Sequence, residues 1–299
     1  MSYIVAIDLG SNSFRVLKYD YIKNQEIGEF DKVISMADGL NKSGNISPEA
    51  INRIIKAIHE SVEKLDYDPS KAIAITTAAM RKANNSSFVL QTIKEKTKAN
   101  FQIIDGDKEA DLTLLSIKNA IKRHNINSDR FLFVDIGGAS SEIVIVNKDD
   151  IIKKSFDFGI VTMSQAPNPK QALEDARNEI INFIKDKNIQ EFGFFATAGT
   201  PTTLAAIKQG LNAKEYDKTK VNGTVLTKED LNHYYTLLKN LDNDSLIFLV
   251  GSRKIEFVLT GIKIFNMFYE TLGFDSSIVF DDGLKEGIIL EALEQINNQ

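Results

Sequence analysis

The chain of 299 residues contains no cysteine, only three histidines and no long apolar run. Without cysteine, neither a disulfide nor a thiolate metal site can form. The histidines, His59, His124 and His233, lie too far apart in the chain to indicate a zinc site. No apolar run approaches the ~18 residues of a membrane span, and the N-terminal segment does not resemble a signal peptide. We therefore expect a cytoplasmic protein with no membrane partner.

The chain also lacks an excess of basic residues, because its net charge is −5. Proteins that bind nucleic acids broadly present a basic surface, so we expect no nucleic-acid partner. A polyanionic ligand is compatible with this charge, since a local cluster of Lys and Arg can attract an anion to an acidic protein. Apolar residues make up 43% and charged residues 26%, which is ordinary globular composition.

In the first half of the chain, strand patterns alternate with helix patterns, which predicts an α/β sheet. The clearest helix begins at Ser47-Pro48, a typical start signal, and places apolar residues at helical spacing. The expected strands cover 3–9, 14–21, 26–34, 71–79 and 101–105, and the expected helices cover 48–65, 88–97 and 107–124.

A polar segment, 123–129, interrupts this alternation, and the pattern then restarts. We therefore predict a first domain over 1–123, completed by the terminal helix 284–299, and a second domain over 124–283. The expected elements of the second half are three strands within 130–159, strands at 192–200 and 276–280, and helices over 170–186, 201–209, 227–240, 252–272 and 283–296.

Two loop motifs recur in the same order in the two halves. Asp8-x-Gly10 matches Asp135-x-Gly137, 127 residues later. The segment AITTAA matches FATAGT, with Thr77 set against Thr197. An ordered pair of matches at similar offsets indicates an internal duplication.

The sequences DLGSNS and DIGGASS are typical of phosphate-binding loops. Glycine permits positive φ and close approach to a ligand, and small residues around it expose successive N–H groups to an anion. Asp8 and Asp135 add hard oxygen ligands of the kind that Mg²⁺ prefers. An ordinary β-hairpin turn explains one copy equally well, but two copies favour the phosphate site.

Gly199, Thr200 and Pro201 follow an apolar strand and open a helix, with Pro201 expected at its first position. A helix N-terminus of this kind is a natural phosphate site. A simple well-capped helix start is an equally good interpretation.

Three charged side chains near these loops each have a functional and a purely structural interpretation. Arg81, just beyond a strand, can grip phosphate bidentately or can be a solvated surface charge. Glu109 can be catalytic, or can complement the dipole of its helix. Glu142 follows the second loop and points into the site or to solvent.

Taken together, AIDLGSNSFRVL, TTAAMRKANN, DIGGASSEIV, AGTPTTLAAI and DDGLKEGII resemble the Ppx/GppA family of exopolyphosphatases and guanosine pentaphosphate phosphohydrolases. That family belongs to the actin/Hsp70/sugar-kinase superfamily. The resemblance implies two ribonuclease H-like (actin-like ATPase) α/β domains related by internal duplication, with mixed sheets flanked by helices and a cleft between them. It is closest to the short form, which has no C-terminal HD-like domain.

The resemblance also implies roles for individual residues. Glu109 matches the catalytic base, and Glu142 matches the acid that positions the attacking water or the cation. Metal ligands would be Asp8, Asp135 and Glu142. The implied phosphate-binding residues are Gly10, Ser11, Asn12, Ser13, Arg15, Arg81, Gly137, Gly138, Ser140, Gly199, Thr200 and Arg253.

The chain departs from the family pattern at two places. Lys108-Glu109-Ala110-Asp111 stands where the family usually has paired acids followed by arginine, and Ala139 replaces a third glycine. The first departure bears on substrate grip. The second requires a loop conformation that does not need glycine.

The activity implied is release of the terminal phosphate from inorganic polyphosphate or guanosine pentaphosphate by a homodimer. Mg²⁺ is the expected cofactor, with another divalent cation or K⁺ as alternatives. One rival is an ATP-dependent small-molecule kinase of the same superfamily, which would need a phosphate acceptor. A second rival is a catalytically weak regulator that binds polyphosphate or a nucleotide without turnover.

Overall fold

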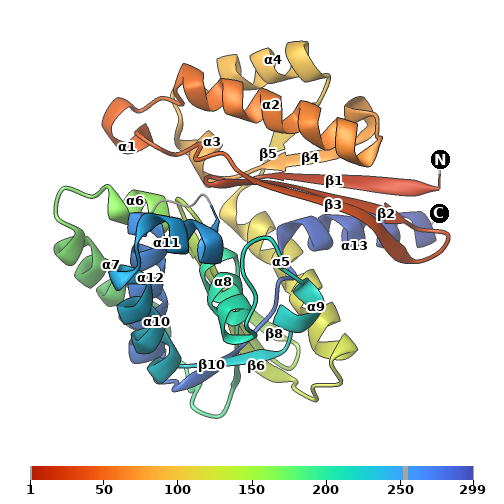
Figure 1. Ribbon diagram of the computed structural model, residues 1–299. Helices are drawn as coiled ribbons and strands as arrows, with labels where there is room; N and C mark the ends of the chain where they lie inside the picture. The colour runs from red at the N-terminus through yellow and green to blue at the C-terminus, as the bar shows by residue number, and fades with distance from the viewer. Residues whose placement is uncertain (1, 252–254, 299) are drawn as a thin grey trace. The chain divides into compact units, whose positions relative to one another are not determined.

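A computed structural model describes residues 2–251 and 255–298. The contacts divide the chain into two compact units. Unit 1 comprises Met1–Ser116 and Asp282–Gln299, and unit 2 comprises Ile117–Asp281. Each unit contains one mixed β-sheet flanked by helices (Figure 1). Within the described residues, no helix has both the length and the apolar character needed to cross a membrane.

Unit 1 has a five-stranded sheet in the order β3-β2-β1-β4-β5. Neighbours among β1, β2 and β3 are antiparallel, whereas β4 runs parallel to β1 and β5 parallel to β4. Helices α2 and α4 cover one face, and α5 and α13 the other (Figure 1). The strands are β1 Tyr3–Leu9, β2 Ser13–Asp20, β3 Gln25–Val33, β4 Ile73–Thr76 and β5 Phe101–Ile103; the helices are α1 Leu40–Ser43, α2 Pro48–Leu65, α3 Ala78–Lys82, α4 Ser86–Thr97, α5 Gly106–Arg123 and α13 Leu284–Asn297, with a 3-10 turn at Pro69–Lys71.

The terminal helix α13 completes the core of unit 1. Its Leu284, Ile288 and Ile289 join residues of β1, β2, β4 and α5 in one buried apolar cluster. Central strand β1 is buried from Val5 to Leu9, which explains its continuous apolar run, since a strand covered on both faces does not alternate. The helix therefore belongs to the unit to which the sequence analysis assigned it.

Unit 2 has a six-stranded sheet in the order β10-β11-β9-β6-β7-β8. Strands β6, β7 and β8 are antiparallel neighbours, β9 runs parallel to β6 and β11 parallel to β9. The run β8-β7-β6-β9-β11 thus repeats the order and directions of β3-β2-β1-β4-β5. This repeat confirms the α/β class and the duplication. The strands are β6 Arg130–Ile136, β7 Ser141–Asn147, β8 Asp150–Phe156, β9 Gly193–Thr197, β10 Thr224–Thr227 and β11 Ser276–Val279.

Helices α6, α7, α8 and α10 pack against α12, whose Phe265, Phe268 and Tyr269 are fully buried. The helices are α6 Ile160–Ser164, α7 Pro169–Ile184, α8 Gly199–Lys208, α9 Lys218–Val221, α10 Lys228–Asn240, α11 Asn243–Val250 and α12 Ile255–Leu272. The first residues of the predicted helix 252–272 lie outside the described residues. Helix α11 was not predicted, although Asp242 caps it by accepting a hydrogen bond from Ser245 N at 2.9 Å.

Two details of the predicted organisation differ from the structure. The division falls between Ser116 and Ile117, because α5 continues through it and buries Ile117, Ala120 and Ile121 in unit 2. The polar segment 123–129 marks the end of that helix rather than the boundary. In the sheets, Asp8 lies opposite Ile75 and Asp135 opposite Thr197, so the register equates Thr197 with Ile75, not Thr77.

Candidate functional site

The first loop, between β1 and β2, is held by its carbonyl groups. Gly10 N donates to Ser13 O at 3.0 Å, and N–H groups of the segment 34–37 donate to the carbonyl oxygens of Asn12 and Ser11 at 2.8 to 2.9 Å. The N–H groups of Ser11 and Asn12 reach no backbone acceptor within the part of the chain that the structure describes. These amides can therefore serve an anion.

The second loop, between β6 and β7, is held in the same way. Ile160 N donates to Gly137 O at 2.9 Å, and Val161 N donates to Gly138 O at 2.8 Å. Gly159 packs directly on this loop, because a Cβ there would lie 2.6 Å from the carbonyl carbon of Gly138. The sequence analysis missed Gly159; its only signal is a glycine shortly after the third strand of the meander.

Close packing, and not positive φ, explains the glycine at position 137 and, less strongly, the one at position 10. Gly10, Gly137 and Gly138 all lack the left-handed conformation expected for them. Instead, a Cβ at Gly137 would lie 2.8 Å from Ser140 O, and one at Gly10 would lie 3.3 Å from Ser13 O. Ala139 also has no positive φ and is fully buried, so the third glycine of the family pattern is not needed here.

A polar row crosses the sheet of unit 2 beside its loop. Glu142 lies opposite Asp135 on one neighbouring strand and opposite Ser155 on the other, and Asp135 lies opposite Thr197. Side chains opposite each other in register project to the same face. Ser155 Oγ donates to Glu142 Oε1 at 2.7 Å, and Glu142 is 2% exposed. The burial rejects the alternative that Glu142 is an exposed strand position. Ser155 was not predicted.

The equivalent row of unit 1 has a different charge pattern. Asp8, which is buried, lies opposite Arg15, and Arg15 lies opposite Asp31. Arg15 Nε donates to Asp31 Oδ2 at 2.9 Å. An arginine thus occupies the register position that Glu142 occupies in unit 2. Asp31 has no motif that would have predicted its role.

Arg81 and Glu109, two separately predicted residues, meet in unit 1. Arg81 Nη1 donates to Ile104 O at 2.6 Å and lies 3.2 Å from Glu109 Oε2. The Glu109 side chain is 13% exposed. Asp105 caps this end of α5 by accepting a hydrogen bond from Lys108 N at 2.8 Å. The carboxylate of Glu109 is therefore oriented by a guanidinium in a fixed helical turn.

The first loop and Arg81 are connected through α3. Ser11 Oγ accepts a hydrogen bond from Ala79 N, near the start of that helix, at 3.2 Å. Thr76 Oγ1, at the end of β4, donates to Leu9 O at 2.8 Å. These bonds join the loop, α3 and Arg81 into one framework within unit 1.

Helix α8 begins earlier than predicted. It starts at Gly199, so Pro201 is its third residue rather than its first, and Ala198 before it has φ 75°. Left-handed φ at a residue other than glycine is strained, and such strain is common at functional sites. A Cβ at Gly199 would meet nothing within 4 Å, so packing does not require this glycine.

Thr200 offers its backbone rather than its hydroxyl. Its Oγ1 would lie 2.0 Å from a Cβ built at Gly261 of α12, so the hydroxyl faces that helix. The predicted role of Thr200 in phosphate binding is therefore limited to its N–H group. Arg253, also predicted to bind phosphate, lies outside the described residues.

The predicted metal ligands fall into two groups, with Asp8 in unit 1 and Asp135 and Glu142 in unit 2. Residues 2–251 and 255–298 contain no cluster of three or more acidic or histidine side chains that could hold a metal ion. Two adjacent carboxylates nevertheless fit Mg²⁺, which commonly binds one or two carboxylates and completes its shell with phosphate oxygens and water.

Comparison with known sequences gives a consistent result. The family model of the Ppx/GppA phosphatase family matches residues 18–296. A bifunctional 3-dehydroquinate synthase/phosphatase of Fusobacterium nucleatum is 26% identical over 97% of this chain and 46% of its own length. A guanosine-5'-triphosphate,3'-diphosphate pyrophosphatase of Photobacterium profundum is 26% identical over 98% of this chain and 60% of its own length. The chain thus spans about half of these curated relatives.

Solved structures share the fold over nearly the whole chain. An exopolyphosphatase from Cytophaga hutchinsonii has a TM-score of 0.82 at 20% identity and covers 98% of both chains. The Aquifex aeolicus member of the Ppx/GppA family has a TM-score of 0.72 at 22% identity and covers 99% of both chains.

Proposed function

The chain belongs to the Ppx/GppA phosphatase family, and from this premise we propose that it hydrolyses the terminal phosphoanhydride bond of inorganic polyphosphate or guanosine pentaphosphate. One observation carries the proposal. Arg81 lies 3.2 Å from Glu109 and is linked through α3 to the amide-rich first loop. A carboxylate, a guanidinium and a phosphate-type loop on one framework suit attack of water on a phosphate.

In the proposed step, Glu109 acts as the general base. It takes a proton from water while the water oxygen bonds to the terminal phosphorus and the bridging P–O bond breaks. The products are inorganic phosphate and a substrate shortened by one phosphate. Positioning and charge neutralisation supply most of the rate enhancement in such reactions, which is why no protein nucleophile is needed.

Each loop, together with the charged row of its own unit, offers groups that would bind phosphate. Amides of Ser11, Asn12 and Gly138 offer donors whose direction is fixed by the tethered carbonyls of each loop. Arg15 adds positive charge in unit 1, held at 2.9 Å by Asp31. The loop of unit 2 adds Ser140, which is buried beside Gly137.

We assign a divalent cation, Mg²⁺ by default, to Asp135 and Glu142 of unit 2, and keep Asp8 as a separate candidate ligand within unit 1. Bound there, the cation would neutralise phosphate charge. Ser155 supports this assignment because its hydroxyl fixes the buried Glu142 at 2.7 Å. We extend the proposal to a homodimer in the cytoplasm, on the family resemblance.

The decisive assay measures inorganic phosphate released from polyphosphates of several lengths and from guanosine pentaphosphate, each with and without Mg²⁺. We expect cation-dependent release from at least one substrate without any added acceptor. Release only with an acceptor and ATP would favour the kinase. Binding without turnover would favour the regulator.

A further inference from the structure

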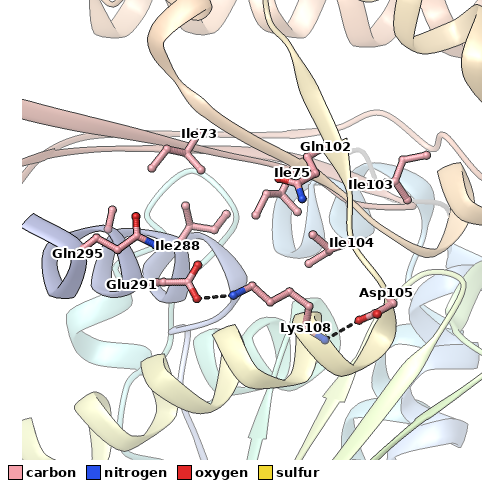
Figure 2. Close-up of a pocket in the computed structure, with 11 residues that line it drawn as sticks. Ile73, Ile75, Gln102, Ile103, Ile104, Asp105, Lys108, Ile288, Glu291 and Gln295 are labelled. Carbon is pink, nitrogen blue, oxygen red and sulfur yellow. Dashed lines mark hydrogen bonds and ion pairs between the residues drawn. The ribbon is translucent and has the colours of Figure 1, made fainter.

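A groove on unit 1 separates the first turn of α5 from helix α13. Its volume is about 540 Å³. Figure 2 shows isoleucines from the strands and from α13 around it, and the Lys108 side chain extending from α5 toward Glu291 on α13. The Lys108 ammonium and the Glu291 carboxylate form an ion pair.

The two helices touch directly one turn away from this ion pair. A Cβ at Gly287 would lie 2.0 Å from Leu112 O, so the backbones of α13 and α5 are in contact there. Gly287 precedes Glu291 by one helical turn, whereas Leu112 follows Lys108 by one turn. The helices therefore run antiparallel. One turn beyond the backbone contact, the Lys108–Glu291 ion pair connects them across the groove.

The turn that this ion pair secures contains Glu109. Asp105 caps it through Lys108 N at 2.8 Å, and Arg81 holds both Ile104 O, at 2.6 Å, and Glu109, at 3.2 Å. These contacts are made by α3 and by the residues that follow β5. Glu291 contacts the same turn from α13.

We propose that Lys108 is a positioning residue, which fixes the first turn of α5 to α13 through Glu291 and so sets the direction of the Glu109 carboxylate. The inference rests on the proposed function for its kinetic consequence. It gives a role to a lysine that replaces an acid of the family pattern. Partly exposed ion pairs contribute little to global stability, so the effect should appear in the turn and in catalysis rather than in folding.

The test compares Lys108→Met with Lys32→Met. Lys32 pairs with Glu60 elsewhere in unit 1, with side chains 35% and 36% exposed, against 41% and 34% for Lys108 and Glu291. Lys108→Met should lower kcat for phosphate release by about tenfold, because small displacements of a reacting group are costly, and should leave KM within about twofold. Lys32→Met should change neither constant.

Three further variants test whether Lys108 acts through Glu291. Glu291→Gln should reproduce the loss of kcat, the double variant Lys108→Met/Glu291→Gln should lose no more than either single one, and Lys108→Glu/Glu291→Lys should recover most of it. A raised KM with normal kcat would mean that Lys108 contacts substrate. Normal kinetics in Glu291→Gln would mean that the pair is not used. Either result overturns the proposal.

Hydrogen exchange makes the inference independent of the proposed activity. The amides of Lys108 and Glu109, which donate to Asp105 at 2.8 and 3.1 Å, should exchange faster in Lys108→Met than in the wild-type protein or Lys32→Met, with no substrate present. If the wild-type protein releases no phosphate, the proposed function fails and this measurement alone decides the inference. Unchanged exchange at those amides would overturn it.

Discussion

The two three-stranded meanders, β1–β3 in unit 1 and β6–β8 in unit 2, have the same strand order and directions. They differ in the charge of the side chain that lies opposite the aspartate of the first strand. Asp8 faces Arg15 across the first hairpin, and Asp135 faces Glu142 across the second. In both, the segment after the third strand donates hydrogen bonds to the loop carbonyls. The strand order and directions are thus shared, and the side chain opposite the aspartate, Arg15 in one copy and Glu142 in the other, is what differs. The duplication produced two similar hairpin loops, and their side chains now differ.

The largest effect expected within this comparison concerns the row of unit 2, to which we assign the cation. Glu142→Gln removes one of two neighbouring carboxylates and should lower kcat by about 10²–10³, an effect typical of losing a group that organises charge in the reacting complex. The dependence on Mg²⁺ concentration should shift to higher values. Ser155→Ala is the matched second variant, because it leaves the carboxylate but removes its 2.7 Å hydrogen bond. Wild-type Mg²⁺ dependence in Glu142→Gln would remove the metal assignment.

In the row of unit 1, removing the charge of Arg15 should weaken substrate binding rather than lower the catalytic rate. Arg15→Gln keeps a polar side chain but removes the charge, so KM should rise by about tenfold, corresponding to the loss of a charge-assisted hydrogen bond. The rise should be smaller at high salt, since screening weakens the interaction in the wild-type protein too. Steady-state kinetics at two ionic strengths checks this. An unchanged KM would show that Asp31 keeps Arg15 away from the substrate.

The two loop glycines should differ in their tolerance of a methyl group. A Cβ would lie 2.8 Å from a carbonyl oxygen at Gly137 but 3.3 Å at Gly10. Gly137→Ala should therefore lower the free energy of unfolding by about 1–3 kcal/mol, and Gly10→Ala by less. Chemical denaturation of both variants provides the comparison. Equal losses would mean that the loops are not packed as described.

The smallest effect compares buried tyrosines of the two units. Tyr269 donates to Leu226 O at 3.0 Å and shares a hydrogen bond of 2.7 Å with Ser277 Oγ. Tyr269→Phe should therefore lower the free energy of unfolding by about 1 kcal/mol. Burial raises the pKa of Tyr269, and burial also raises that of Tyr67 in unit 1. A raised pKa contributes stability that is complete below the unfolded value near 10 and is lost as the pH rises further. The free energy of unfolding, expressed relative to its value at neutral pH, should thus begin to fall at lower pH in the wild-type protein than in Tyr269→Phe.

Sequence reasoning was strongest where the signal is local. The hairpin loops around Gly10 and Gly137 and the α/β class follow from short motifs and from alternation of strands and helices, whereas the role of Glu109 came from the family resemblance and stays a prediction. Positive φ was the wrong reason for these glycines, since close packing selects the same residue, and close approach to a ligand stays a prediction. The start of α8 was misplaced because the strained Ala198 resembles an ordinary loop residue.

Residues that act across the sheet had no such signal. Asp31, Ser155 and Gly159 matter because register and packing bring them against Arg15, Glu142 and the second loop. Strand pairing sets the contacts of Asp31 and Ser155, and packing of the residue before α6 sets that of Gly159; no local pattern specifies either. The pairing of Arg81 with Glu109 is likewise set by tertiary structure, since the sequence places them 28 residues apart.

The central claim is that Glu109 activates water for hydrolysis of a terminal phosphoanhydride. Its most direct test is single-turnover phosphate release by the wild-type protein, Glu109→Gln and, as the neighbouring acid on the same helix, Asp111→Asn. Loss of a general base should slow release by about 10²–10⁴ in Glu109→Gln, with substrate still bound, while Asp111→Asn stays close to wild type. Wild-type release by Glu109→Gln would contradict the account.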